Sequence, residues 1–468
     1  MLKPPQVDYI PEWARRAIFY HIYPIGFFNA PRENSGRSAA VPRLAALRDY
    51  YDHLGGLGVT ALYLGPIFES HTHGYDTIDY FSVDRRLGDV PLLRQIISEL
   101  HERGMRVILD GVFHHTGRGF FAFRDLIENG RDSQYKDWYF LNWGADSGYG
   151  DGFSYECWEG FEELPRLNLD NPAVREYLFA VNKMWLGDVG IDGWRLDMAY
   201  KINPTFWWGF RRLSKELRSD CFLVGEVIGG DYRTWVASDL LDSGTDYQLY
   251  KALWSSLNSK NFWELKAVLE RAHHTEFGLY QDLSMLTFLG NHDVNRILSQ
   301  LEDRRHLYAA LILLLSLPGI PCLYYGDEIG MTGEVKGPQG DYPVRQQMPA
   351  PDGAWPNADR SLYRETAKLT GIRKAHPSLI YGRFAALETG YQTFSFLREH
   401  PREAAVVIVN AGDKAAQMEI AIGREGIPDG VVFHDLLDDD RPTFTVSGGT
   451  LVVDELYPHW GRVLIAER

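Results

Sequence analysis

The sequence predicts an α/β protein, a (β/α)8 TIM barrel with a loop subdomain after strand three and a C-terminal antiparallel β-sandwich. Eight short apolar runs recur between residues 17 and 326, and amphipathic helical stretches separate them. The competing fold is a doubly wound parallel sheet. It would place a glycine-rich phosphate loop early in the chain, and the sequence contains none.

The predicted barrel strands are buried runs, because their apolar residues are continuous rather than alternating. They cover residues 17–23, 59–68, 105–113, 191–197, 221–227, about 244–249, 283–290 and 319–326. Residues 91–103 have apolar positions at helical spacing, with Gly104 as a stop signal. The stretch 171–186 begins with Asn171 as a cap and Pro172 in the first turn, so a helix is expected there too.

The spacing divides the chain into three parts. Residues 1–113 and 170–383 form the predicted barrel. Residues 114–169 form a long aromatic-rich connection, which is expected to be a small subdomain whose aromatic side chains mostly pack among themselves. Residues 384–468 read as seven short alternating strands separated by turn residues, which predicts the sandwich.

Composition excludes several classes of partner. The 468 residues carry a formal charge of −15, which argues against binding nucleic acid or an anionic membrane surface. The longest apolar run, residues 307–320, is too short and too broken to span a membrane. Three distant cysteines suggest neither a disulfide framework nor a metal cluster, and no secretory signal is visible at the N-terminus. A cytoplasmic protein is expected.

The segment 190–200, GIDGWRLDMAY, carries the strongest chemical signal. Side chains alternate along a strand, so Arg195 and Asp197 point the same way at the C-terminal end of the fourth strand. The arginine would keep the aspartate ionised, as a carboxylate nucleophile requires. A buried ion pair that only stabilises the barrel explains these two residues equally well.

Polar residues at the other strand ends favour the catalytic interpretation. Active sites of (β/α)8 barrels lie at the C-terminal ends of the strands. In this chain those ends carry Tyr75, Asp76, Asp110, His114, His115, Arg195, Asp197, Glu226, Asn291, His292, Asp293, Asp327 and Glu328. A barrel with only structural requirements would not need charge at so many strand ends.

Six of these segments, in the same order, resemble those of the α-amylase family, glycoside hydrolase family 13. They are HGYDTIDY, DGVFHH, GIDGWRLD, VGEV, GNHD and GIPCLYYGDE. The segment LPRLN at residues 164–168 is similar to the MPKLN signature of the neopullulanase and cyclomaltodextrinase branch. Residues 341–345, DYPVR, resemble that branch's loop after strand eight, which contacts the sugar beyond the cleaved one.

The resemblance implies roles for particular residues. Asp197 would be the nucleophile, Glu226 the general acid/base, and Asp293 the carboxylate that stabilises the transition state. Carboxylates about 5–5.5 Å apart would support double displacement with retention. The remaining implied substrate-binding residues are Tyr75, which would stack on the ring at the cleavage site, His115, Arg195, His292, Asp341 and Arg345. Asp110 is expected to be a structural partner of Arg195 or of the local loop rather than a catalyst.

The chain departs from the family pattern at several positions. His114 stands where many α-amylases have a calcium-ligating asparagine, which argues against the usual calcium site. No cofactor is expected, although a structural calcium ion is compatible with the sequence. Tyr200 and Lys201 replace an Asn-Glu pair, and Ile228 replaces a tryptophan, so unusual acceptor subsites are expected. Lys201 binding a sugar hydroxyl and Lys201 simply solvated are equally compatible with the sequence. The N-terminal domain through which many branch members dimerise is not in this sequence. A homodimer remains compatible with it.

The sequence therefore predicts a retaining α-glucoside hydrolase that cleaves α-1,4 bonds, with α-1,6 bonds also compatible, in short or cyclic malto-oligosaccharides. One alternative is a transglycosylase or isomerase that uses the same Asp197 intermediate. The other is a non-catalytic carbohydrate-binding subunit, which would be expected to lack at least one of the three carboxylates; all three are present.

Overall fold

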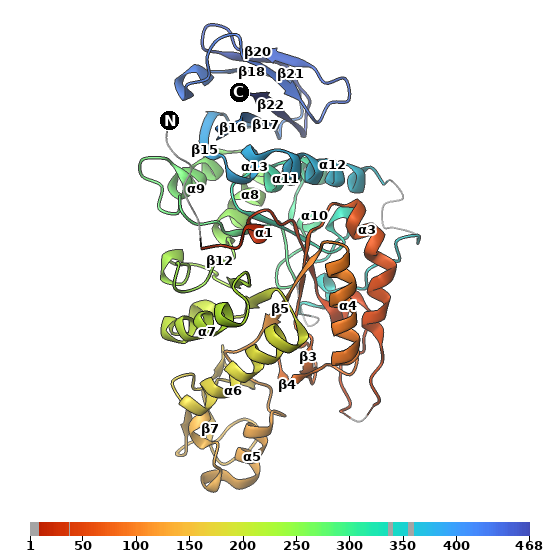
Figure 1. The fold of residues 1–468 in the computed structure, drawn as a ribbon, viewed down its shortest axis with the longest axis vertical. Helices are drawn as coiled ribbons and strands as arrows, with labels where there is room; N and C mark the ends of the chain where they lie inside the picture. The colour runs from red at the N-terminus through yellow and green to blue at the C-terminus, as the bar shows by residue number, and fades with distance from the viewer. Residues whose placement is uncertain (1–8, 37, 336–339, 354–359) are drawn as a thin grey trace.

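The computed structural model describes residues 9–36, 38–335, 340–353 and 360–468. Its centre is a parallel sheet of eight strands (Figure 1). The strands are β1 (Phe19–Ile22), β2 (Ala61–Leu64), β5 (Arg106–Gly111), β10 (Gly193–Leu196), β11 (Phe222–Gly225), β12 (Ser243–Gly244), β13 (Leu286–Phe288) and β14 (Ile320–Tyr324). A parallel bridge between Thr245 and Leu286 joins the two ends of the sheet, so the predicted barrel is confirmed.

The barrel interior is filled by alternate side chains of its strands. Phe19, Tyr63, Ile108, Phe222 and Phe288 belong to one buried cluster at its centre. Gly193 allows β10 and β11 to approach closely, because a Cβ there would lie 2.0 Å from the carbonyl oxygen of Phe222. The strand ends above this core are consequently held in a fixed register.

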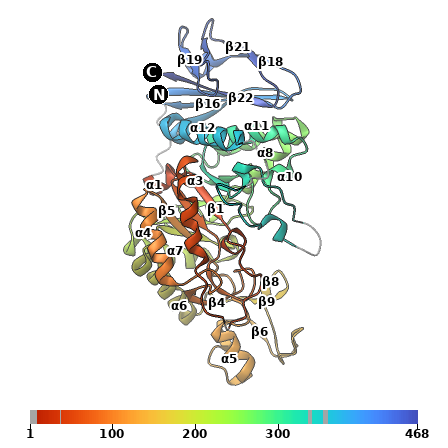
Figure 2. The same ribbon diagram turned by 90° about the vertical axis from the view of Figure 1, so that its right-hand side faces the viewer.

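Helices cover the outside of the barrel (Figures 1 and 2). The longer ones are α4 (Val90–Glu102), α6 (Pro172–Lys183), α7 (Pro204–Leu217), α8 (Tyr247–Ser259), α9 (Trp263–His273), α11 (Leu307–Ser316) and α12 (Ser361–Ala375). Asn171 caps α6 by accepting a hydrogen bond from Ala173 N, as the sequence predicted. Shorter helices are α1 (Glu12–Arg15), α2 (Pro24–Phe27), α3 (Tyr51–Gly56), α10 (Ile297–Gln300) and α13 (Pro377–Tyr381).

The long connection after β5 forms α5 (Phe121–Asn129) and two small hairpins. The hairpins are β6 (Leu141–Asn142) with β7 (Ser154–Tyr155), and β8 (Cys157–Trp158) with β9 (Phe161–Pro165). This segment lies at the end of the molecule opposite the C-terminal strands (Figure 1). Several of its aromatic side chains, such as Phe120, Phe123 and Trp138, are buried in a cluster that continues into the barrel's outer core. The lobe is therefore packed onto the barrel and does not have a separate core.

The C-terminal strands form two antiparallel sheets. The larger one contains β15 (Arg383–Thr389), β16 (Thr393–His400), β17 (Glu403–Asn410), β19 (Val432–Asp435), β20 (Thr443–Thr445) and β22 (Trp460–Glu467). The smaller pairs β18 (Ala416–Ile420) with β21 (Leu451–Leu456). Apolar residues of both sheets share one buried cluster, which is the core of the sandwich.

Two details of the prediction are wrong. The sixth barrel strand is only Ser243–Gly244, and the predicted stretch 244–249 includes the start of α8, for which Asp246 is the cap. The first sandwich strand, β15, was not predicted, because its half-buried positions do not alternate cleanly.

In the described part of the chain, no helix is long and apolar enough to cross a membrane.

Candidate active site

Arg195 links the carboxylates at the ends of three barrel strands. Its Nη1 donates to Asp110 at 2.9 Å and to Asp197 at 2.8 Å, while its Nη2 lies 2.7 Å from Glu226 Oε1. Asp110 belongs to β5, Asp197 follows β10, and Glu226 follows β11. Neighbouring parallel strands bring these residues together, and the predicted pairing of Asp110 with Arg195 is confirmed.

The charges in this cluster do not balance. One guanidinium serves three carboxyl groups, all of them buried. Burial raises the pKa of Asp197 well above its usual range and also raises the pKa of Glu226, although Arg195 opposes both shifts. Arg195 thus acts on Asp197 in the predicted direction, toward the ionised form that a nucleophile needs, while burial acts against it. The raised pKa of Glu226 favours the protonated carboxyl group that a general acid requires.

Asp293 has a different environment at the end of β13. Its carboxylate lies 2.8 Å from Arg345 Nη2 and 2.9 Å from His292 Nε2. Burial acts to raise the pKa of Asp293, but His292 and Arg345 outweigh it and hold that pKa below its usual range. The side chain is 37% exposed, so an ionised carboxylate faces the opening of the barrel.

Arg345 also brings Asp341 to this group. Its Nη2 lies 2.8 Å from Asp341, and its Nε donates to the backbone carbonyl of His292 at 2.9 Å. The guanidinium lies over the ring of Tyr23. The loop after strand eight is thus tied to the end of strand seven.

Tyr75 and His115 lie next to this cluster, and Tyr75 also stacks on His292. The Tyr75 hydroxyl donates to Asp110 at 3.0 Å and also contacts His292 Nε2, and the Tyr75 carbonyl accepts from His115 Nε2 at 3.1 Å. Burial lowers the pKa of His115 well below its usual range, so its ring is neutral. His114 is buried next to His115, and the Nδ1 atoms of the two rings lie 3.3 Å apart.

The residues after Asp197 form the rim of the site. Met198 has a φ of 49°, an unfavourable backbone conformation for a non-glycine residue, and its N–H donates to Glu226 Oε2 at 3.0 Å. Tyr200 and Lys201 lie in the short helical turn that follows. Tyr200 is half-buried, its N–H 3.3 Å from the carbonyl oxygen of Glu226, whereas Lys201 is exposed.

Trp158 of the long connection reaches the same rim, although no sequence motif marks it. Its indole N–H contacts Met198 Sδ at 3.3 Å, and its ring stacks on Phe161. The connection 114–169 contains many aromatic residues, and the distance in sequence between Trp158 and Asp197 does not distinguish Trp158 from the others. The one signal in the sequence was the residue type itself, because an indole ring can stack on the face of a sugar.

A closed barrel with paired carboxylates around one arginine and an aromatic rim has the features of a carbohydrate-active hydrolase. Sequence comparison agrees. The family model described as "Alpha amylase, catalytic domain" matches residues 21–345 of this chain. The chain belongs to the α-amylase family and is a glycoside hydrolase of that family.

Individual relatives are similar over most of the chain. A Bacillus cyclomaltodextrinase is 33% identical over 443 residues, covering 88% of this chain and 76% of the relative. Neopullulanase 2 of Thermoactinomyces vulgaris is 34% identical, covering 86% and 71%. The intracellular maltogenic amylase of Bacillus subtilis is 33% identical, covering 69% and 57%.

Two solved structures have the same fold throughout. The cyclic α-maltosyl-(1→6)-maltose hydrolase of Arthrobacter globiformis superposes with a TM-score of 0.80 at 31% identity, covering 98% of this chain and all of that one. The debranching enzyme of Nostoc punctiforme gives 0.81 at 27% identity, covering 97% and 99%.

Proposed function

We propose that this enzyme hydrolyses α-1,4 and α-1,6 bonds of short and cyclic malto-oligosaccharides with retention of configuration. The observation that carries the proposal is the Arg195 guanidinium, which joins Asp197 and Glu226 at adjacent strand ends. Two carboxyl groups held beside one another fit double displacement better than an inverting reaction, which needs a wider separation.

In this mechanism each carboxyl group has one role. Glu226 gives its proton to the glycosidic oxygen while Asp197 attacks the anomeric carbon and forms the glycosyl ester. Glu226 then removes a proton from water, which attacks the same carbon and releases the sugar. Asp293, kept ionised by His292 and Arg345, binds hydroxyls of the sugar ring and stabilises its developing positive charge.

The substrate class is supported by the relatives. Those named above include hydrolases of cyclic sugars and a debranching enzyme. The name of the Bacillus subtilis relative supports an intracellular location. A homodimer stays a prediction that gel filtration or sedimentation would test.

A transglycosylase is the second candidate, because the rim carries apolar side chains where an acceptor would enter. Ile228, two residues after Glu226, is 47% exposed, and Tyr200 lies beside the Glu226 backbone. An apolar acceptor site favours a sugar ring over water.

The test is a time-resolved product profile with maltotriose, panose, a cyclodextrin and soluble starch. The wild type should cut the small and cyclic sugars faster than starch, and panose reports the linkage preference. Asp197→Asn should lose at least about 10³-fold in kcat, whereas Asp188→Asn, an exposed carboxylate elsewhere, should not change it. Early accumulation of larger oligosaccharides would establish the transglycosylase instead, and no cleavage of any α-glucoside would refute both.

A further inference from the structure

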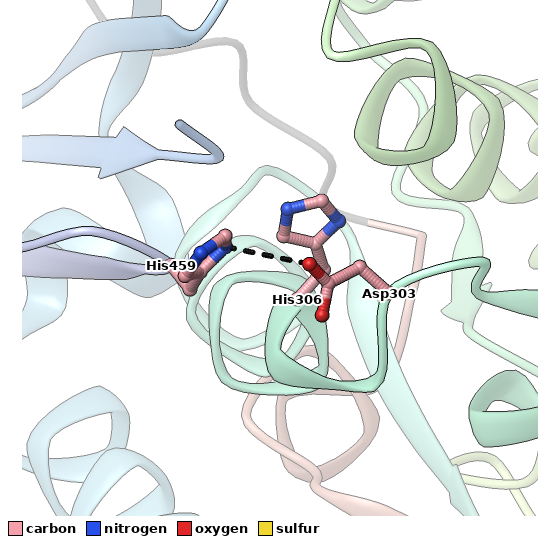
Figure 3. Close-up of side chains that lie close together, drawn as sticks. All are labelled: Asp303, His306 and His459. Carbon is pink, nitrogen blue, oxygen red and sulfur yellow. Dashed lines mark ion pairs between the residues drawn. The ribbon is translucent and has the colours of Figure 1, made fainter. Parts of the chain in front are cut away.

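Three potential metal ligands meet between the barrel and the C-terminal sandwich (Figure 3). Asp303 and His306 lie in the short helical turn just before α11, and His459 lies in the turn between β21 and β22. One ligand atom from each residue lies within 4.8 Å of the others. His459 Nδ1 is 4.0 Å from Asp303 Oδ2.

His306 presents an unpaired lone pair to this cluster. Its ring is 1% exposed, and Nε2 lies 2.9 Å from the carbonyl oxygen of Ala411. A carbonyl only accepts, so Nε2 carries the proton and Nδ1 is the basic nitrogen. Among the described residues, Nδ1 has no hydrogen-bond partner. Burial lowers the pKa of His306, which favours the neutral ring that a metal ion needs.

Within the described part of the chain, His459 also directs a ring nitrogen without a hydrogen-bond partner toward Asp303. It is 7% exposed, and neither ring nitrogen has a hydrogen-bond partner among the described residues. Its Nδ1 faces Asp303, while its Nε2 lies 3.2 Å from Asp413 Oδ1. A φ of 56° shows that the turn holds this histidine in an unfavourable backbone conformation. Metal-bound histidines commonly direct their second nitrogen to a carbonyl or a carboxylate, which Ala411 and Asp413 provide here.

The surrounding charges set a limit on the affinity. Arg305 contacts both Asp303 and Asp413, and Lys260 contacts Asp413. The Asp303 carboxylate already accepts from Arg305, whose Nε donates to Oδ1 at 3.0 Å and whose Nη2 donates to Oδ2 at 2.7 Å, so an incoming cation has to displace this side chain. Arg305 is 61% exposed in its side chain, so it can move away from an incoming cation.

We propose that Asp303, His306 and His459 form a binding site for a divalent transition-metal ion, with zinc as the probe. Two imidazoles and one carboxylate suit zinc and do not suit calcium. In a tetrahedral zinc site, metal–ligand bonds of about 2.0–2.1 Å place the ligand atoms about 3.4 Å from one another. The distance of 4.0 Å between His459 Nδ1 and Asp303 Oδ2 would therefore need to shorten only slightly. The ion would link the barrel to the sandwich, because each contributes a ligand.

The experiment uses the full chain, stripped with a chelator and returned to metal-free buffer. Bound zinc per chain is measured after gel filtration, and the unfolding temperature is measured with added zinc or calcium. We expect one zinc per chain and a rise of about 2–3 °C when zinc is a hundredfold above its Kd, with no rise from calcium.

Variants connect the binding to these residues. His459→Gln and Asp303→Asn should weaken zinc binding at least about tenfold, while Arg305→Gln should preserve or strengthen it. His434→Gln, an exposed histidine of the same sandwich, is the matched control and should bind like wild type. Failure of the wild type to bind zinc, binding that survives in His459→Gln, or an equal response to calcium would each overturn the proposal. Circular dichroism confirms that the variants are folded.

Discussion

Arg195 is the residue on which the active site depends most. It is almost fully buried and holds three carboxyl groups, which its single charge cannot neutralise. Burial raises the pKa of Glu226, so ionisation of this carboxyl group opposes folding, while its protonated form is the general acid that the proposed reaction needs.

Replacement of Glu226 by glutamine tests this cost. Burial raises the pKa of Glu226, so the folded protein binds a proton more tightly than the unfolded chain does. Stability from that proton is complete below the unfolded pKa of about 4.3 and is lost as pH rises through the folded pKa. Glu226→Gln should therefore be inactive, yet as stable as wild type or more stable at pH 7.

Thermal unfolding of both proteins at pH 4.0 and 7.0 measures the effect. The advantage of Glu226→Gln should shrink at the lower pH. A variant less stable than wild type at pH 7 would show that the ion pair with Arg195 outweighs the burial of the carboxylate.

At the scale of elements, the long connection after β5 brings Trp158 to the rim beside Met198. The side chain is half-buried, so one face of the indole remains available to a sugar. The position depends on the hairpin of β8 and β9, in which Trp158 pairs with Phe161.

Trp158→Ala should raise KM for malto-oligosaccharides by about 5–20-fold with a smaller effect on kcat, because stacking contributes about 1–2 kcal/mol to sugar binding. Steady-state kinetics on maltotriose and a cyclodextrin would measure this. Tyr149→Ala, an exposed aromatic of the same connection, is the control. A loss confined to kcat would instead mean that Trp158 positions Met198 and, through it, Glu226.

At the scale of the whole molecule, the barrel and the sandwich share a tightly packed junction. Arg398 of β16 is 1% exposed and donates to the carbonyl oxygens of Ser316 and Gly382. Tyr308 of α11 also packs on Trp460 of β22, with ring centroids 5.0 Å apart. Such contacts predict that the barrel and the sandwich unfold together.

Arg398→Met should destabilise the protein by about 2–4 kcal/mol, because it leaves buried carbonyl groups without donors. Denaturant unfolding followed by two spectroscopic probes would measure the change and test for a single transition. The exposed Arg402→Met is the control and should stay within about 0.5 kcal/mol of wild type. A change of that small size in Arg398→Met would mean that water replaces the guanidinium.

The sequence by itself determined the order of the barrel strands and the residues at their ends. Arg195 and Asp197 could be assigned to one side because strand alternation is a local property. The same local reasoning failed for the sixth strand, where only Ser243 and Gly244 pair, and for β15. Short strands owe their existence to neighbours that are distant in the sequence.

Only the tertiary structure decided which distant groups meet and how their charges combine. Arg345 approaches Asp293 across 52 residues, and His459 approaches Asp303 across more than 150. Neither contact has a local pattern, because each depends on closure of the barrel or on docking of the sandwich. The raised pKa of Asp197 likewise follows from burial and from the sharing of Arg195 among three carboxyl groups, and both arise only once the strands are side by side.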